Sequence, residues 1–229
     1  MKNIAVIPAR GGSKRIPKKN IKDFNGKPLI AYPITQALKS NLFDDVIVST
    51  DDEEIAAISE KYGAKVPFLR DKKLSDDFTG TFAVVKDAYN RLKNIYNPDS
   101  VCCIYATAPL LTAEHLSNAY SKFQNSDASS LVSVCEFSFP IQRAFIVNED
   151  GYISYREPEY AMTRSQDLAK CYQDCGLFYI YSKELLEGQI EDKTISYQMP
   201  RHRVIDIDTP EDWDYARALY NAVNSLNLD

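Results

Sequence analysis

Residues that build several common kinds of site are scarce in this sequence. Its 229 residues include only two histidines, His115 and His202, which lie in separate segments. They suggest neither a Ser-His-Asp triad nor a Cys-His pair. The five cysteines are not spaced as a disulfide framework. Cys171 and Cys175 have no second cysteine pair or histidine nearby, so we expect ordinary small or buried residues there rather than zinc ligands.

Long hydrophobic runs and an excess of positive charge are also missing. The apolar stretch at the start is too short for a signal peptide, so we expect a soluble, cytoplasmic protein. The formal net charge is −5, from 27 basic and 32 acidic residues, which argues against a nucleic-acid or membrane partner. A local basic site is still compatible with this balance. The length fits one domain over residues 1–229.

Short apolar runs alternate with amphipathic segments in the first half of the chain. The segments Ile55–Tyr62, Phe82–Leu92 and Leu116–Phe123 carry apolar residues at helical spacing. This alternation predicts an α/β fold with a Rossmann-like, doubly wound and mainly parallel sheet. The runs expected to form strands buried on both faces are Asn3–Pro8, Val46–Ser49, Val66–Leu69, Val101–Tyr105 and Leu131–Glu136.

The pattern changes between residues 137 and 175, where no clear helix is indicated. Alternation over Ala144–Val147 and Tyr152–Tyr155, around a polar turn, predicts a β-hairpin. We interpret residues 137–175 as a small insertion, after which the main fold resumes at Gly176–Tyr181. Thr209–Pro210 predicts the start of a final helix. Its core face would consist of Trp213, Ala216, Tyr220 and Val223.

The segment that follows the first strand is the most informative one. Residues 9–20 read Ala-Arg-Gly-Gly-Ser-Lys-Arg-Ile-Pro-Lys-Lys-Asn, and ligands of open α/β sheets lie beyond the carboxyl ends of strands. Gly11 and Gly12 let the backbone approach a ligand, and the Ser13 hydroxyl can bind a phosphate oxygen. The cations Arg10, Lys14 and Lys19 can neutralise a polyphosphate. The segment matches neither the Walker nor the dinucleotide motif, and the alternative is a solvated surface loop.

Two acidic pairs lie at the ends of apolar runs. Asp206 and Asp208 alternate with isoleucines, so in a strand both carboxylates share one face and could hold Mg²⁺ together with substrate phosphates. The alternative is an acidic N-terminus for the final helix. Asp51 and Asp52 could approach a ligand, or Asp52 could cap the helix that contains Ile55.

The segment Ile7–Ile21 resembles the opening signature of the cytidylyltransferases that activate acidic nine-carbon sugars, the CMP-sialic acid synthetase family. Further segments agree in order and cover nearly the whole chain, namely Val48–Asp52, Pro67–Arg70, Ser75–Asp77, Thr107–Pro109 and Ile205–Thr209. The resemblance implies a fold of the nucleotide-diphospho-sugar transferase type. It also implies transfer of CMP from CTP to the anomeric hydroxyl of a nine-carbon 2-keto sugar acid, with release of pyrophosphate.

The resemblance also assigns roles to residues. It implies that the phosphates of CTP bind to Arg10, Gly11, Gly12, Ser13, Lys14, Lys19 and Asn20. It implies cytidine contacts at Arg70, Ser75, Asp76 and Thr79, although Asp76 could instead cap the following helix. It implies Mg²⁺ at Asp206 and Asp208, and charge stabilisation of the reaction by Arg10, Lys14, Lys19 and Asp208.

The segments expected to bind the acceptor depart from the sialic acid pattern. Tyr105–Pro109 stands where sialic acid enzymes have Gln-Pro-Thr-Ser-Pro, and Gln173–Gly176 where they have Arg-Pro-Asn-Gly. These segments are more similar to the branch of the family that acts on pseudaminic acid. That acid carries acetamido groups at C5 and C7 and a methyl at C9, which suits a less polar pocket. The candidate sugar-binding residues are Tyr105, Gln142, Arg143, Arg164 and Gln166, with the arginines on the carboxylate.

Several alternatives stay open from the sequence. The acceptor could be N-acetylneuraminate, legionaminate or the eight-carbon acid of lipopolysaccharide, and a sugar 1-phosphate is a further candidate. A chain of a different class would be a noncatalytic nucleotide sensor. The family resemblance implies a homodimer joined through the hairpin region, with Phe137, Phe139, Phe145 and Tyr155 at the interface or over their own core. The product could serve flagellin glycosylation or a surface polysaccharide.

Overall fold

The first strand of the sequence is also the centre of the observed fold. In the computed structural model, which describes residues 2–76, 78–226 and 228, β1 (Asn3–Pro8) lies between β4 (Asp45–Ser49) and β5 (Ser100–Ile104) and is parallel to both. All three are almost wholly buried, as their apolar sequences predict. The predicted strand at Val66–Leu69 is wrong. This stretch runs parallel to the edge strand β4 but meets it only at isolated bridges, Lys65 with Ile47 and Leu69 with Thr50.

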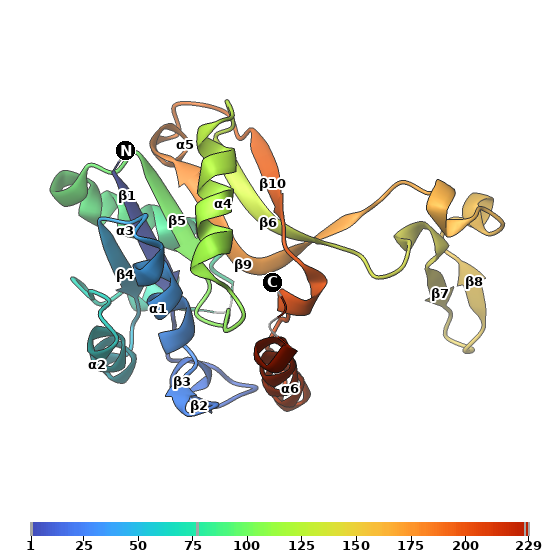
Figure 1. Cartoon of the computed structure of the whole chain (residues 1–229), viewed down its shortest axis with the longest axis horizontal. Helices are drawn as coiled ribbons and strands as arrows, with labels where there is room; N and C mark the ends of the chain where they lie inside the picture. Colours follow the sequence, from blue (N-terminus) through green and yellow to red (C-terminus); the bar gives the residue numbers. More distant parts are fainter. Residues whose placement is uncertain (1, 77, 227, 229) are drawn as a thin grey trace.

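The central sheet has six strands in the order β10-β6-β9-β5-β1-β4 (Figure 1). β9 (Tyr172–Ser182) runs antiparallel to both of its neighbours, β5 and β6 (Ser130–Glu136), while β10 (Thr194–Gln198) is parallel to β6. The predicted α/β fold with a mainly parallel sheet is therefore confirmed. Two small two-stranded sheets pair β2 (Asp23–Phe24) with β3 (Lys27–Pro28) and β7 (Phe145–Val147) with β8 (Ile153–Tyr155).

Helices cover both faces of the sheet. The α-helices are α1 (Ala31–Ser40), α2 (Glu53–Lys61), α3 (Thr81–Tyr96), α4 (Ala113–Gln124), α5 (Lys183–Glu187) and α6 (Pro210–Leu226). α1, α2 and α4 pack into the core on one face, and α3 and α5 pack on the other. The predicted helical segments become α2, α3 and α4. α1 was not predicted from the sequence; it contains Pro33 in its first turn, where a proline is tolerated.

The last helix stands apart from these two layers. Thr209 caps α6, since its hydroxyl accepts a hydrogen bond from the Asp212 backbone N–H at 3.2 Å. Trp213 and Ala216 pack against Phe24 and Ile207 in a separate small core, which confirms the predicted face of the helix. The residues before α6 are not a strand, so the prediction for Asp206 and Asp208 was wrong in that respect. They lie in an extended segment in which Ile207 is buried and Asp206 is exposed.

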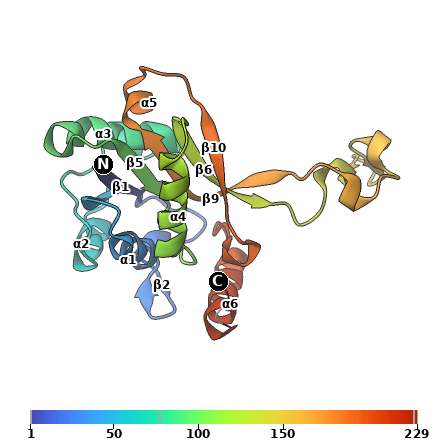
Figure 2. The same cartoon turned by 45° about the horizontal axis from the view of Figure 1, so that its top comes forward.

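β6 and β9 continue beyond the body of the molecule and carry a protruding arm, residues 137–171 (Figures 1 and 2). The arm contains the predicted hairpin, β7–β8, and single 3-10 turns. β9 already begins at Tyr172, four residues before the predicted return to the main fold. Among the described residues, no helix combines the length and apolar composition needed to cross a membrane.

Candidate active site

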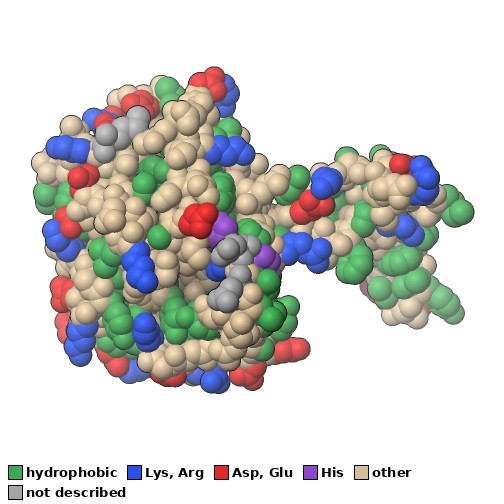
Figure 3. All heavy atoms as spheres, in the orientation of Figure 1, with side chains coloured by type: hydrophobic (Ala, Val, Ile, Leu, Met, Phe, Trp, Pro, Cys, Tyr) green, Lys and Arg blue, Asp and Glu red, His purple; other side chains and the backbone are tan. Residues whose placement is uncertain are grey.

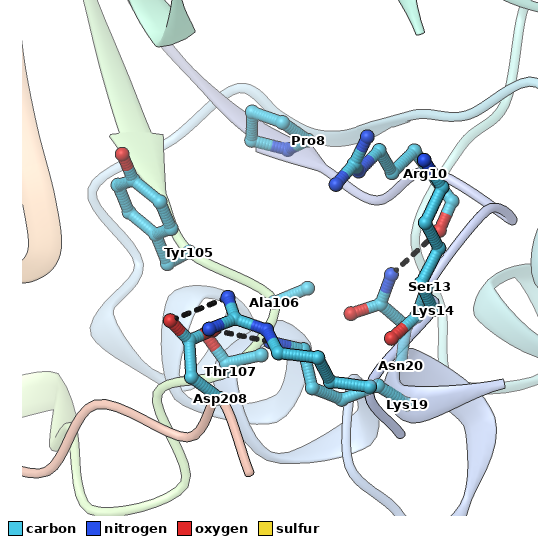
Figure 4. A pocket seen from close by; sticks show the side chains of 11 residues that line it. Pro8, Arg10, Ser13, Lys14, Lys19, Asn20, Tyr105, Ala106, Thr107 and Asp208 are labelled. Carbon is cyan, nitrogen blue, oxygen red and sulfur yellow. Dashed lines mark hydrogen bonds and ion pairs between the residues drawn. The ribbon is translucent and has the colours of Figure 1, made fainter. Parts of the chain in front are cut away.

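A cavity of about 310 Å³ opens beyond the carboxyl ends of β1 and β5 (Figure 4). This is the position at which open α/β sheets bind ligands. The residues that line it are Pro8, Arg10, Ser13, Lys14, Arg15, Lys19, Asn20, Tyr105, Ala106, Thr107 and Asp208. Four cations therefore face a single carboxylate in this lining. The cavity combines the predicted cationic loop with residues more than eighty positions away in the sequence.

The cationic loop is held by contacts behind it. The Gly11 backbone N–H donates to Asp51 Oδ1 at 3.0 Å, so one of the two acidic residues after β4 fixes the loop. The Asn20 side chain is buried and donates to the Arg10 carbonyl oxygen at 3.0 Å, which joins the two ends of the loop (Figure 4). Asp52 caps α2 by accepting from the backbone N–H groups of Glu54 and Ile55, as one of its two interpretations predicted.

Asp208 is the acidic centre of the cavity. Arg15 lies 2.7 Å from Asp208 Oδ2 and Lys19 lies 3.3 Å from Oδ1. Lys19 also donates to the Ile207 carbonyl oxygen at 2.6 Å, so two contacts with the segment before α6 hold its ammonium group. Asp206 is not in the lining, but partial desolvation of its carboxyl, and next the nearby charge of Asp208, raise its pKa. The two carboxylates therefore repel one another, and a bound cation would reduce this repulsion.

A second, smaller cavity of about 230 Å³ adjoins the first and shares Pro8 and Arg10 with it. Its other lining residues are Arg70, Leu74, Asp76, Thr79, Thr81 and Val84. Arg70 is only 5% exposed and donates from Nε to the Ser75 hydroxyl at 3.0 Å. Burial lowers the pKa of Arg70, and Asp51 opposes that shift from 3.9 Å. Arg70, Ser75, Asp76 and Thr79, the residues predicted to contact cytidine, therefore lie together.

Asp76 does not cap the following helix, so that alternative was wrong. It accepts from the backbone N–H groups of Phe78 and Thr79 in a local turn, while α3 begins only at Thr81. Asp77, which belongs to the same sequence motif, lies outside the described residues.

Tyr105 lines the main cavity and forms an aromatic wall with neighbouring tyrosines that do not themselves line it and were not predicted from the sequence. Its hydroxyl shares a hydrogen bond of 2.7 Å with Thr81 at the start of α3, and its ring centroid lies 5.8 Å from that of Tyr179 on β9. Tyr179 stacks on Tyr181 at 6.1 Å and donates to Asp174 Oδ2 at 2.6 Å. The alternation of tyrosines along β9 was a signal that could have indicated this wall.

The other predicted sugar-binding residues are not brought to this cavity within one chain. Gln142, Arg143, Arg164 and Gln166 all lie in the arm. Gln142 is buried and donates to the Ala169 carbonyl oxygen at 2.8 Å, so it stabilises the arm. Arg164 pairs with Asp167 at 2.7 Å. Gln166 lines a separate cavity of about 330 Å³ in the arm.

The lining determines what the site can do chemically. Arg15 and Thr107 also line the cavity, although the sequence predicted no role for either residue. Arg15 is part of the cationic loop, and Thr107 is part of the Thr107–Pro109 motif. The cationic loop and its backbone suit a chain of phosphates. Among the residues that the structure describes, no group of three or more His, Cys, Asp or Glu side chains could hold a metal ion. Asp206 and Asp208 would therefore need phosphate or water oxygens to complete a magnesium shell.

Comparison with known proteins connects this geometry to a family. A family model described as Cytidylyltransferase matches residues 4–227. The chain is 50% identical, over 226 residues, to the pseudaminic acid cytidylyltransferase of Campylobacter jejuni serotype O:2, covering 96% of this chain and 97% of that one. It is 32% identical to the CMP-N,N'-diacetyllegionaminic acid synthase of Legionella pneumophila, over 100% and 99% of the two chains. A solved CMP:2-keto-3-deoxy-manno-octonic acid synthetase, complexed with CTP, has a TM-score of 0.70 at 20% identity, covering 97% and 99%, which supports the fold.

Proposed function

The chain belongs to the cytidylyltransferase family, and from that premise we propose that it transfers CMP from CTP to pseudaminic acid. The similarity to the Campylobacter pseudaminic acid cytidylyltransferase, which extends over nearly all of both chains, carries this proposal. The anomeric hydroxyl oxygen of the acid attacks the α-phosphorus of CTP. The bond from that phosphorus to the bridging oxygen breaks, pyrophosphate leaves, and the hydroxyl proton passes to solvent.

The cationic loop supplies the electrostatic part of this reaction. Arg10, Lys14 and Lys19 surround the cavity at the carboxyl end of β1, where the triphosphate would lie. Negative charge accumulates on the β- and γ-phosphates as pyrophosphate leaves, and fixed cations stabilise that charge without reorganising during the reaction. Lys19 is already oriented by Ile207 and Asp208, so its ammonium group is positioned before CTP binds.

The cytidine would occupy the smaller cavity beside the loop. Arg70 is oriented by Ser75 and lines this cavity together with Asp76 and Thr79. A buried guanidinium and the hydroxyl of Thr79 can hydrogen-bond a pyrimidine or its ribose. Arg10 borders both cavities, which supports a nucleotide that spans them with its α-phosphate near Arg10.

Asp206 and Asp208 fit a magnesium ion by the chemistry of their donors. Two carboxylates with hard oxygen atoms are a common protein contribution to a Mg²⁺ shell that substrate phosphates complete. The raised pKa of Asp206 supports this fit, because a cation between the carboxylates would remove their repulsion. When bound there, magnesium would neutralise phosphate charge and orient the triphosphate. Binding would require Asp208 to exchange its contacts with Arg15 and Lys19 for the ion.

We also propose that two copies associate through the arm. Its tip exposes a continuous set of apolar side chains, drawn in green at the arm in Figure 3, of which Val147 and Ile153 are each 63% exposed. Apolar surface of this kind on a thin protrusion is covered in stable proteins by a partner. Arg143 and Arg164 of one copy do not reach the main cavity of their own chain. In such a dimer they could approach the main cavity of the second copy. Of the predicted interface residues, Phe145 on β7 belongs to this hairpin, and Phe139 is exposed at another point of the arm.

Release of pyrophosphate tests the proposed reaction. The protein is incubated with CTP and pseudaminic acid, with Mg²⁺ or with a chelator, and both pyrophosphate and the mass of the sugar product are measured. Metal-dependent formation of CMP-pseudaminate supports the proposal. Binding of CTP without turnover of any nine-carbon acid would favour a nucleotide sensor instead.

A further inference from the structure

The residues at the end of β4 hold the start of the cationic loop. The Ala9 backbone N–H donates to the Ser49 carbonyl oxygen at 2.9 Å, and two residues later the Gly11 N–H donates to Asp51 Oδ1 at 3.0 Å. Arg10, which borders both cavities, lies between these two contacts. One short segment of the chain therefore fixes the backbone on both sides of Arg10.

The same segment holds the buried arginine of the smaller cavity. The Arg70 backbone N–H donates to the Thr50 carbonyl oxygen at 2.7 Å, and Arg70 Nη2 lies 3.9 Å from Asp51 Oδ1. The Arg70 side chain is buried, and a buried charge needs an opposite charge nearby to offset its loss of water. The Asp51 carboxylate supplies that charge, and it also opposes the repulsion between Arg70 and Arg10.

One carboxylate oxygen thus joins two walls that lie far apart in the sequence. Asp51 Oδ1 accepts from Gly11 at the start of the cationic loop and faces Arg70 in the smaller cavity. Asp51 is not among the described residues that line either cavity. Any effect of Asp51 on a bound nucleotide would therefore pass through the positions of Gly11 and Arg70.

We propose that Asp51 is a positioning residue that sets the spacing between the smaller cavity and the cationic loop. This inference rests on the proposed function, in which CTP spans the two cavities. A molecule with two binding ends gains full affinity only where both subsites lie at the separation of those ends. The hydrogen bond to Gly11 fixes one subsite, and the charge beside Arg70 fixes the other. The α-phosphate between them is thereby held in one place relative to both.

Binding of CTP and of its two halves tests this inference. Cytidine and tripolyphosphate each occupy one subsite, whereas CTP needs both at the correct separation. We expect Asp51→Ala, which removes both contacts, to weaken CTP binding about tenfold, the value of one good hydrogen bond. Each half should lose about twofold or less, because the removed negative charge favours tripolyphosphate and offsets the looser loop. In Asp51→Asn the side-chain oxygen can still accept from Gly11, so CTP affinity should stay closer to that of the wild type.

The matched control is Asp45→Ala, at the other end of β4. The Asp45 side chain is 18% exposed, against 23% for Asp51, and it also pairs with a cation, Lys65. It lies at the edge of the sheet opposite to the cavities, because the cationic loop follows the carboxyl end of the neighbouring strand β1. This variant should leave the affinities for CTP, cytidine and tripolyphosphate unchanged.

Calorimetry at one Mg²⁺ concentration and without a sugar acid gives the three dissociation constants, and the melting temperature of each variant is recorded. The product of the two fragment constants divided by the CTP constant measures the gain from joining the halves. A merely structural residue would lower the melting temperature without changing this gain. An unchanged gain in Asp51→Ala would overturn the inference. Absence of CTP binding by the wild type would overturn the proposed function as well, whereas failure of pseudaminic acid to accept CMP would overturn the proposed substrate alone.

Discussion

Asp52 occupies the space that a side chain at Gly11 would need. A Cβ atom built on Gly11 would lie 2.6 Å from Asp52 Oδ2 and 2.9 Å from Asp52 Cβ. The same aspartate caps α2, so it cannot move without exposing backbone N–H groups of that helix. The contact with Asp52, which lies between β4 and α2, therefore fixes the backbone position at the start of the cationic loop. This close approach is a physical reason for glycine at residue 11.

Gly11→Ala should displace the cationic loop. The added methyl would force apart the loop and the start of α2, and a displacement of about 1 Å near reacting groups can cost about a hundredfold in rate. We expect kcat/KM for CTP to fall by about this factor. Gly12→Ala is the matched control, because a Cβ at residue 12 meets no atom within 4 Å. Equal effects of the two substitutions in steady-state kinetics would show that the contact with Asp52 does not position the loop.

Asp208→Asn should impair catalysis more than folding. The substitution keeps the shape of the side chain but removes the charge that orients Arg15 and Lys19 and that we assign to magnesium. We expect kcat/KM to fall by about a hundredfold or more and the Mg²⁺ concentration for half-maximal rate to rise. Asp214→Asn, exposed on α6, should leave both quantities unchanged. Unaltered magnesium dependence in Asp208→Asn would contradict the metal assignment.

The sequence predicted the part of the site that is continuous along the chain. The cationic loop is one such segment, and strand burial places it at the carboxyl edge of the sheet. Arg70 and Thr79 were linked by the family resemblance, and the structure brings them beside Arg10. Of the tyrosines in the aromatic wall, only Tyr105 was predicted. Tyr179 lies beside Tyr105 because β5 pairs with β9 in antiparallel fashion, which the sequence does not reveal.

The errors in the predicted fold have a similar origin. The apolar run Val66–Leu69 indicates neither its burial nor the partner of its backbone hydrogen bonds: Leu69 is exposed, and the edge strand offers only isolated bridges. Asp206 and Asp208 alternate with buried residues as strand residues do, yet no neighbouring strand pairs with them among the described residues. The position of the arm relative to the cavity depends on long-range packing and, in our proposal, on a second chain.

His115 should make stability sensitive to acid. It is half-buried in the first turn of α4, where Nδ1 lies 3.1 Å from the Tyr197 hydroxyl. Burial, and next the charge of Arg203, lower its pKa from the ordinary value of 6.5. The unfolded chain therefore takes up a proton at a higher pH than the folded chain, so stability falls as the pH drops through 6.5. Urea unfolding of the wild type and His115→Gln over this range should show a smaller loss in the variant; parallel curves would contradict this account.

The hairpin of the arm should control association. Val147 and Ile153 face one another across β7 and β8, and both are exposed. Replacing them together, as Val147→Lys with Ile153→Glu, keeps a favourable cross-strand pair but removes the apolar surface. Sedimentation should then show a dimer for the wild type and a monomer for the variant, with CTP affinity retained. Glu149→Gln in the turn is the control, and a wild-type monomer at micromolar concentration would disprove the proposed interface.

The central claim concerns which acid receives CMP, and competition measures that choice most directly. Equal concentrations of pseudaminic acid, N-acetylneuraminate, legionaminate and the eight-carbon acid are offered together with limiting CTP and Mg²⁺, and the CMP-sugars are separated and quantified. The ratio of products equals the ratio of kcat/KM values, so differences in enzyme activity between assays cancel. The account predicts CMP-pseudaminate as the dominant product. A dominant product from any of the other three acids would contradict it.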